Sequence, residues 1–173
     1  MSAQEKLLIK PKKLTSELFK KFGDVIEVSE QSENFAINDG FTQRYHDLAN
    51  VDVNENNGRT LINIFRSVPL SNPIVLESME RHPLSSQAFM PLGHKPYLVV
   101  VAPSGDLVES AIEVFLSSAN QGVNYSAGTW HHYCLALSRT SDFLVIDRGG
   151  EGDNCDEILL SRPIEIDLSE MRI

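Results

Sequence analysis

Short apolar segments alternate with polar, turn-forming clusters along most of the chain. Val, Ile, Phe and Tyr dominate the apolar segments, and Asn, Gly, Pro, Ser and Asp fill the gaps between them. This alternation is typical of an antiparallel barrel or sandwich. The pattern predicts strands at residues 25–28, 61–65, 88–90, 97–102, 111–116, 133–137, 143–146 and 164–168.

One short helix is predicted near the start of the chain. Thr15 can cap its first turn, and Gly23 can end it. Leu18 and Phe22 are four residues apart, so they would share its buried face. A second helix could occupy the long gap at residues 68–80.

The segment at residues 97–101 is apolar at every position. Successive side chains of a strand point to opposite faces, so both faces of this strand must be covered. The cover is either a second sheet or another copy of the chain, and we therefore expect a homodimer.

Strand alternation also separates two adjacent histidines. His131 shares alternate positions with Tyr133, Leu135 and Leu137, whereas His132 lies on the other face. The face with the bulkier side chains is the better candidate for a barrel interior. We therefore predict that His131 points inward and His132 outward.

Composition limits the class of protein. The 173 residues are 42% hydrophobic and 23% charged, with 10 Gly and 8 Pro, which excludes disordered, collagen-like and low-complexity chains. We expect one globular domain over residues 1–173. The longest strongly apolar stretch, residues 98–102, is far shorter than the about 20 residues of a membrane-spanning helix, so we expect no membrane partner.

Charge and cysteine content narrow the partners and the compartment. Lys and Arg total 15 against 24 Asp and Glu, which gives a formal net charge of −9. Such a chain repels phosphate backbones, so nucleic acid is excluded as its main partner. Cys134 and Cys155 are too few for a disulfide framework, which favours a cytoplasmic protein with reduced thiols.

Four of the five histidines lie in unusual polar clusters. His46 lies in RYHDLA (44–49), His82 in ERHPLSSQAF (80–89), and His131 and His132 in GVNYSAGTWHH (122–132). The last two clusters resemble degraded halves of a cupin metal motif, His-x-His with a following Glu and Pro-x-Gly-x-x-His. The candidate ligands of a divalent metal are Glu80, His82, Gln87 and His131. This ligand set has no strong preference for one metal.

Together with DFLVIDRGGEGDNCD (142–156), these clusters resemble the ureidoglycolate lyase family in their order and spacing. The resemblance extends from the predicted helix to Asp156. It implies a mainly β fold, a cupin-like antiparallel β-barrel of the jelly-roll type with a few short helices. It also implies a homodimer that releases glyoxylate and urea from (S)-ureidoglycolate in allantoin breakdown. Nickel is the metal associated with the family.

The implied reaction requires particular side chains. Ureidoglycolate is a hemiaminal, so cleavage needs a base for the hydroxyl proton, an acid for the departing nitrogen and a cation for the carboxylate. His82 and His131 suit acid and base catalysis. Glu80 could orient a histidine, act as the base or bind a metal. Either Arg66 or Arg148 could bind the carboxylate. The residues that could satisfy the urea amide are Gln87, Asn124 and Tyr125.

Two other functions remain open. One is a hydrolase that attacks the ureido carbonyl and releases ammonia. The other is a non-catalytic barrel that binds a small hydroxy acid or a sugar.

Several residues in the motifs have a simpler structural interpretation. Arg44, His46 and Asp47 could form a local hydrogen-bond knot. The segment at residues 146–156 resembles a cation-binding loop but is interpreted as a turn, because it lacks the spacing of an EF-hand. Cys134 fits simple packing, because no matched His and Asn support a thiol nucleophile.

Overall fold

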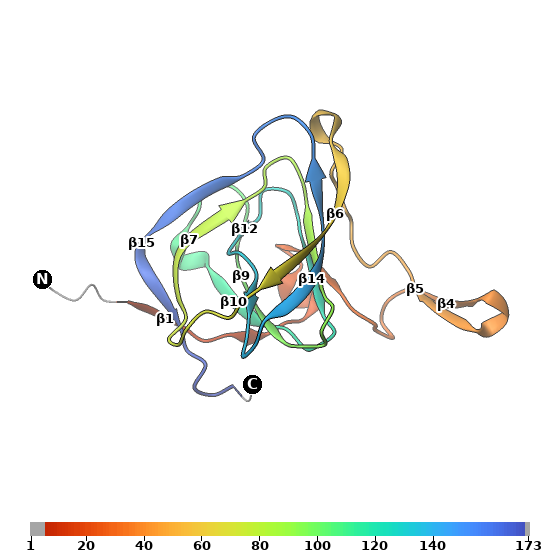
Figure 1. The fold of residues 1–173 in the computed structure, drawn as a ribbon, viewed down its shortest axis with the longest axis horizontal. Coiled ribbons are helices and arrows are strands. Elements are labelled where there is room, and N and C mark those ends of the chain that lie inside the picture. Colours follow the sequence, from red (N-terminus) through yellow and green to blue (C-terminus); the bar gives the residue numbers. More distant parts are fainter. Residues whose placement is uncertain (1–5, 172–173) are drawn as a thin grey trace, which may run out of the picture.

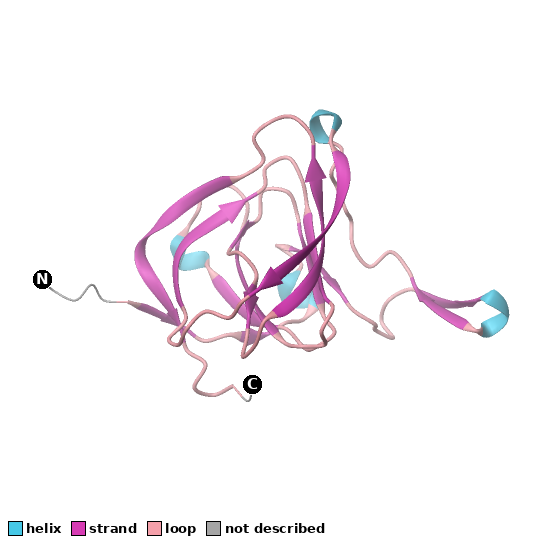
Figure 2. Ribbon diagram, in the orientation of Figure 1, coloured by secondary structure: helices cyan, strands magenta, loops and turns pink. Residues whose placement is uncertain are grey.

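The computed structural model describes residues 6–171, and most of them lie in β-strands (Figure 1, Figure 2). The helices are one α-helix, α1 (Ser16–Phe19), and three single 3₁₀ turns, η1 (Asn38–Gly40), η2 (Glu55–Asn57) and η3 (Glu109–Ala111). The strands are β1 (Leu7–Ile9), β2 (Lys12–Lys13), β3 (Gly23–Ile26), β4 (Asn34–Ile37), β5 (Thr42–Tyr45), β6 (Arg59–Ser67), β7 (Val75–Arg81), β8 (Gln87–Pro91), β9 (Tyr97–Ala102), β10 (Glu113–Leu116), β11 (Gly122–Tyr125), β12 (Trp130–His131), β13 (Leu135–Ala136), β14 (Ser141–Gly149) and β15 (Asp156–Ile166).

Two sheets form the body of the molecule. The larger has the order β1-β15-β7-β12-β9-β10-β2, with β13 also paired to β9, and the smaller has the order β3-β11-β8-β14-β6. The larger sheet is strongly curled (Figure 1). Most neighbours are antiparallel, but β1 pairs with β15 and β2 with β10 in parallel. This architecture confirms the expected mainly β, cupin-like fold with a few short helices.

The hairpin of β4 and β5 extends away from both sheets (Figure 2). It forms a separate two-stranded sheet, and Phe41 at its tip is exposed. The chain returns from the hairpin to the body through residues 46–58, which run along the smaller sheet and lead into β6.

Strand β9 is buried on both faces. Tyr97, Val99 and Val101 belong to a core cluster that joins the two sheets and α1. The alternate residues of β9 belong to a second cluster, inside the curl of the larger sheet. The prediction of two covered faces is confirmed, and the cover comes from the chain itself. The apolar pattern of β9 therefore gives no reason for a homodimer.

The helix near the start is shorter than its pattern predicted. Thr15 caps it as expected, since its Oγ1 accepts the backbone N–H of Leu18 at 3.3 Å. Leu18 and Phe22 were predicted to share the buried face. Phe22 is buried, as is Phe19, but Leu18 is 46% exposed, so the prediction for Leu18 was wrong. The helix spans one turn, so Phe22 lies beyond its end in a turn closed by a bond from Phe22 N to Phe19 O at 2.8 Å.

The second predicted helix is also wrong. Residues 75–81 form β7, which pairs with β15 on one side and β12 on the other. Pro69 and Pro73 interrupt the preceding segment, because proline lacks the N–H that a helix interior needs. Leu76 and Met79 are buried in the second core cluster, so sheet pairing decides the conformation here.

An extra residue separates β12 from β13. Both strands pair with β9, where His131 lies opposite Val101 and Leu135 lies opposite Leu98. Four steps on one strand thus match three on the other, as at a β-bulge, and a single inserted residue exchanges the two faces. The predicted single strand at 133–137 was therefore wrong, and His131 does not share a face with Leu135.

Candidate active site

Three side chains that could act chemically meet where β7 and β12 run side by side. Glu80 on β7 lies directly opposite His131 on β12, and His82 lies in the turn that follows β7. One nitrogen from each histidine and a carboxylate oxygen lie within 4.8 Å of one another. The sheet register thus brings the two degraded half-motifs of the sequence together.

Burial keeps His131 neutral. The side chain is 1% exposed, and its ring stacks on Tyr125 with centroids 4.4 Å apart and planes 5° from parallel. Burial, with a smaller contribution from the nearby His82, lowers the pKa of His131 from 6.5 to about 3. The imidazole therefore has a free nitrogen lone pair at neutral pH.

His82 is oriented by the chain opposite. Its Nδ1 lies 2.5 Å from the carbonyl oxygen of Asn154. A carbonyl only accepts hydrogen bonds, so Nδ1 carries a hydrogen, and in the neutral form of the ring the lone pair lies on Nε2. The rings of His82 and His131 have centroids 5.1 Å apart. The Nε2 atoms of both rings are buried and have no hydrogen-bond partner among the described residues.

Glu80 is half-buried beside the histidines. Burial raises the pKa of its carboxyl group, His82 lowers it and Glu157 on β15 raises it. Its Oε1 lies 3.6 Å from His131 Nδ1, which is beyond a direct hydrogen bond. The carboxylate is thus close enough to influence either ring and remains available to another ligand.

These residues fit a divalent cation. The evidence is the pair of buried Nε2 atoms without partners, next to a carboxylate. Two imidazole nitrogens and one carboxylate oxygen suit several first-row metals without selecting one. The Oε1 atom of Gln87, the fourth predicted ligand, is likewise buried without a partner.

A cavity of about 270 Å³ adjoins His82. The residues that line it are His82, Ser85, Gln87, Asp147, Arg148, Asn154 and Cys155. Most of them come from the turn after β7 and from the end of β14 with its following loop. The loop is tied to the turn, because Asn154 accepts the N–H of Leu84 at 2.7 Å and donates to Ser85 Oγ at 2.9 Å.

The two predicted arginines lie in different places. Arg148 lines the cavity, where its Nε and Nη2 donate to the carbonyl oxygens of Glu55, Asn56 and Glu151. Its Nη1 has no such partner among the described residues and remains available to a ligand. The guanidinium of Arg66 is exposed and forms a two-pronged ion pair with Asp142 at 2.7 and 2.9 Å. Arg66 therefore lies outside the histidine cluster.

The other predicted substrate-binding residues are also divided. Tyr125 stacks on His131, and Gln87 pairs with Tyr125 between neighbouring strands. Asn124 points to the opposite face of β11, where it donates to Asp24 Oδ2 at 3.0 Å and to the carbonyl oxygen of Asn50 at 2.9 Å. The structure therefore does not bring Asn124 to the cavity.

Sequence reasoning missed Asp147 and the roles of the loop that contains Asn154. Asp147 follows the buried residues Phe143 and Val145 at alternate positions of β14. That alternation predicts an inward side chain, so the signal was present. Asn154 contacts His82 through its carbonyl oxygen and residues 84–85 through its side-chain amide. No local sequence pattern predicts such contacts.

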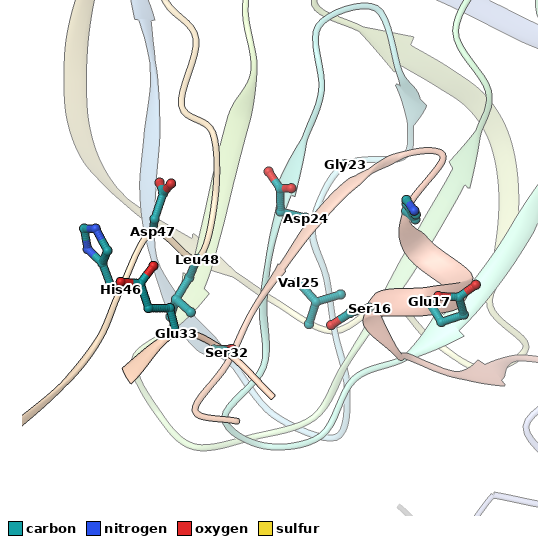
Figure 3. Close-up of a pocket in the computed structure, with 11 residues that line it drawn as sticks. Ser16, Glu17, Gly23, Asp24, Val25, Ser32, Glu33, His46, Asp47 and Leu48 are labelled. Atoms are coloured by element: carbon teal, nitrogen blue, oxygen red, sulfur yellow. The ribbon is translucent and has the colours of Figure 1, made fainter. Parts of the chain in front are cut away.

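The RYHDLA motif borders a separate cavity of about 460 Å³. In Figure 3, His46, Asp47 and Glu33 lie across this cavity from Asp24 and the start of α1. The expected knot is not formed, since Arg44, His46 and Asp47 make no hydrogen bonds to one another in the described chain. Instead the Arg44 guanidinium lies 5.8 Å from the Phe35 ring, and His46 contacts that ring too.

Neither cysteine has the properties of a nucleophile. Cys134 packs against the core cluster between the sheets, and burial raises the pKa of its thiol to about 12. Burial also raises the pKa of Cys155, and the nearby carboxylates of Glu80, Glu157 and Asp156 add to the effect. Both are free thiols. A high pKa leaves little thiolate at neutral pH, so the packing interpretation of Cys134 agrees with the structure.

Comparison with known proteins places this geometry in a family. A model described as ureidoglycolate lyase matches residues 6–167. The chain belongs to the ureidoglycolate lyase family. The resemblance drawn from four sequence motifs is thus confirmed.

Relatives from several bacteria cover most of the chain. A ureidoglycolate lyase of Burkholderia mallei (strain NCTC 10229) is 52% identical over 144 residues, which cover 83% of this chain and 84% of the relative. One from Pseudomonas syringae pv. syringae (strain B728a) is 51% identical, with 88% of each chain covered. One from Chelativorans sp. (strain BNC1) is 45% identical and covers 95% of this chain and 98% of its own.

No helix in residues 6–171 has the length and apolar character needed to cross a membrane.

Proposed function

We propose that this protein is a ureidoglycolate lyase, which cleaves (S)-ureidoglycolate to glyoxylate and urea in allantoin breakdown. The observation that carries the proposal is the cluster of His82, His131 and Glu80, in which His131 is buried and neutral and His82 borders a cavity lined by polar groups, in a member of this family. A cavity of about 270 Å³ has room for a substrate of this size.

The reaction moves one proton and breaks one bond. A base removes the hydroxyl proton, the C–O bond becomes a carbonyl, and the C–N bond breaks. The proton then returns to the departing nitrogen, which completes urea, and no water is consumed. The two rings are neighbours and neither Nε2 has a partner among the described residues, so the histidine pair can accept the proton and pass it on.

Each neighbour of the pair has a defined task. The Asn154 carbonyl keeps the proton of His82 on Nδ1, and the Tyr125 ring fixes the plane of His131. Arg148 is held by backbone carbonyls and offers Nη1 to the substrate carboxylate. Because its guanidinium is already held in place, binding the carboxylate orders little additional structure.

In a metal-bound form, Glu80, His82 and His131 would instead hold a divalent metal, with Gln87 as a further candidate ligand, and the histidine lone pairs that ligate it would not accept the proton. Such an ion would polarise the hydroxyl oxygen and balance the negative charge of the substrate. Nickel is proposed from the family resemblance alone.

The direct test is incubation with racemic ureidoglycolate, followed by assays of urea, ammonia and glyoxylate. We expect equal amounts of glyoxylate and urea and no ammonia. Ammonia in place of urea would indicate the hydrolase, and binding without any product would indicate a non-catalytic barrel. Repeating the assay after dialysis against a chelator, with and without added metal, tests the metal. Activity that survives complete metal removal would reject it.

A homodimer and a cytoplasmic location complete the proposal. The dimer is supported by the family resemblance and by exposed apolar side chains on the edge strand β6, where Ile62 is 73% and Ile64 56% exposed. Sedimentation at micromolar concentration should give about twice the chain mass, and a monomer would reject it. The two free thiols support a reducing compartment.

A further inference from the structure

The cavity beside His82 contains a carboxylate with no cationic partner among the described residues. Asp147 lines the cavity, and no nitrogen of a described Lys, Arg or His lies within ion-pair distance of it. Its Oδ1 accepts a hydrogen bond from Asn63 Nδ2 at 2.9 Å. This bond fixes the plane of the carboxylate, while Oδ2 has no donor among the described residues. The carboxylate is therefore oriented but not neutralised.

A second polar side chain, Gln87, lines the same cavity. Gln87 is more than nine-tenths buried, and its Oε1 has no hydrogen-bond partner among the described residues. A buried acceptor without a donor costs about 1–3 kcal/mol, so such an atom indicates a missing ligand group. Asp147 and Gln87 therefore offer hydrogen-bond acceptors to a ligand that carries donors.

A ureido group supplies donors in a matching arrangement. On the side opposite its carbonyl, it presents two parallel N–H bonds, one from each nitrogen. This fork matches a carboxylate in the same way as a guanidinium does. A carboxylate oxygen has lone pairs to spare, so Oδ1 can accept from both Asn63 and the ligand. The remaining N–H of the terminal nitrogen is left for Gln87, whose Oε1 on this assignment binds the ligand and not a metal.

We infer that Asp147 and Gln87 bind the ureido end of the substrate and select a carbamoyl group over an acyl group. This inference rests on the proposed function and assigns the two ends of the substrate. Asp147 repels the substrate carboxylate, which binds at Arg148 Nη1 instead. The carbon that carries the hydroxyl then lies between these two anchors, beside His82.

Two unreactive ligands test the inference by calorimetry. N-carbamoylglycine has a hydrogen in place of the substrate hydroxyl, and N-acetylglycine further replaces the terminal NH₂ with a methyl group. Both keep the carboxylate. We expect the wild-type protein to bind N-carbamoylglycine at least about tenfold more tightly, because the acetyl compound leaves buried acceptors unpaired. Equal binding of the two, or binding of neither, would overturn the inference.

Variants locate the preference in the cavity. Asp147→Asn keeps the shape but offers an N–H where an acceptor is needed, so the preference should fall to within about threefold. Gln87→Met should reduce it as well, and provides a second measurement if Asp147→Asn folds poorly. Asp142→Asn is the matched control, since it removes a carboxylate from the same strand outside the cavity, and it should keep the full preference. An unchanged preference in both cavity variants would contradict the assignment.

The calorimetric result is independent of turnover. A wild-type protein that prefers N-carbamoylglycine but releases no urea or glyoxylate would refute the proposed function and leave the ureido site standing. A wild-type protein that releases both products without this preference would refute the ureido site alone.

Discussion

Burial sets the protonation state of His131. Removing water from around an imidazole disfavours its charged form, and this is the main reason why the pKa of His131 falls to about 3. The Asn154 carbonyl fixes the tautomer of His82 by hydrogen bonding alone. Two different physical effects thus prepare the two histidines, burial for His131 and the hydrogen bond to Asn154 for His82.

Substituting either histidine should reduce catalysis without unfolding the protein. We expect His82→Gln and His131→Gln each to lower kcat by at least about tenfold, because each removes a proton acceptor. His132→Gln is the control: His132 is 5% exposed and its ring contacts Tyr133, outside the cluster, so it should lose stability but keep most of its activity. Steady-state assays and melting temperatures measure both effects. Full activity in His131→Gln would remove that residue from the mechanism.

His131 should also make stability depend on pH. Its folded pKa, about 3, is below its ordinary value of 6.5, so between these values the unfolded chain binds a proton that the folded chain does not. The free energy of unfolding should therefore decrease as the pH falls from 6.5 towards 3, by up to about 1.4 kcal/mol per pH unit from this group.

Urea titrations at several pH values, with chelator present, check this dependence. His131→Gln removes the group, so the free energy of unfolding of that variant should vary less steeply over the same range. Identical slopes for the two proteins would show that His131 binds its proton equally in both states.

At the scale of elements, tertiary contacts decide which side chains of the short helix α1 are buried, more than the periodicity of its sequence does. The single turn of α1 buries Phe19, which contacts the rings of Phe22 and Phe115, and leaves Leu18 largely exposed. Phe19→Ala should thus cost about 3–5 kcal/mol of unfolding free energy. Leu18→Ala should cost less than about 1 kcal/mol. Urea denaturation of both variants measures the difference, and the reverse order would restore the pattern-based interpretation.

The sequence predicted long, isolated strands well. Strand β9 was predicted with its observed bounds, and the cores of β6, β8 and β14 were found because each is a run of apolar residues between turn-forming clusters. It predicted β7 poorly, since that strand depends on pairing with β12 and β15. Pairing between distant segments is not encoded in local periodicity.

The residues of the site could be predicted from local motifs, but their arrangement depends on strand pairing. The motifs identified Glu80, His82 and His131 individually, and the register of β7 and β12 brings them together. Arg66 and Arg148 could not be separated in advance, because only the fold determines that Arg148 lines the cavity and Arg66 pairs with Asp142. The bulge after His131 was likewise invisible, since it inserts one residue without any glycine or proline to mark it.

At the scale of the whole molecule, β9 joins two cores. Its alternate side chains belong to different clusters, Tyr97, Val99 and Val101 to one and Leu98, Val100 and Ala102 to the other. Unfolding of this strand would therefore disrupt both clusters at once. We therefore expect residues 1–173 to unfold as one domain in a single cooperative transition.

A destabilising substitution in one cluster should then also lower the stability of the other cluster. Trp130 is the one tryptophan of the chain and belongs to the second cluster, so its fluorescence reports on that cluster. Val99→Ala truncates a residue of the first cluster and should cost about 1–3 kcal/mol. If the two clusters unfold together, Val99→Ala lowers the urea midpoint of Trp130 fluorescence as much as the midpoint of far-UV circular dichroism. Val100→Ala, on the opposite face of β9, is the matched control and should shift both midpoints equally too. A Trp130 midpoint that moves with Val100→Ala but not with Val99→Ala would show two independent cores and refute the single domain.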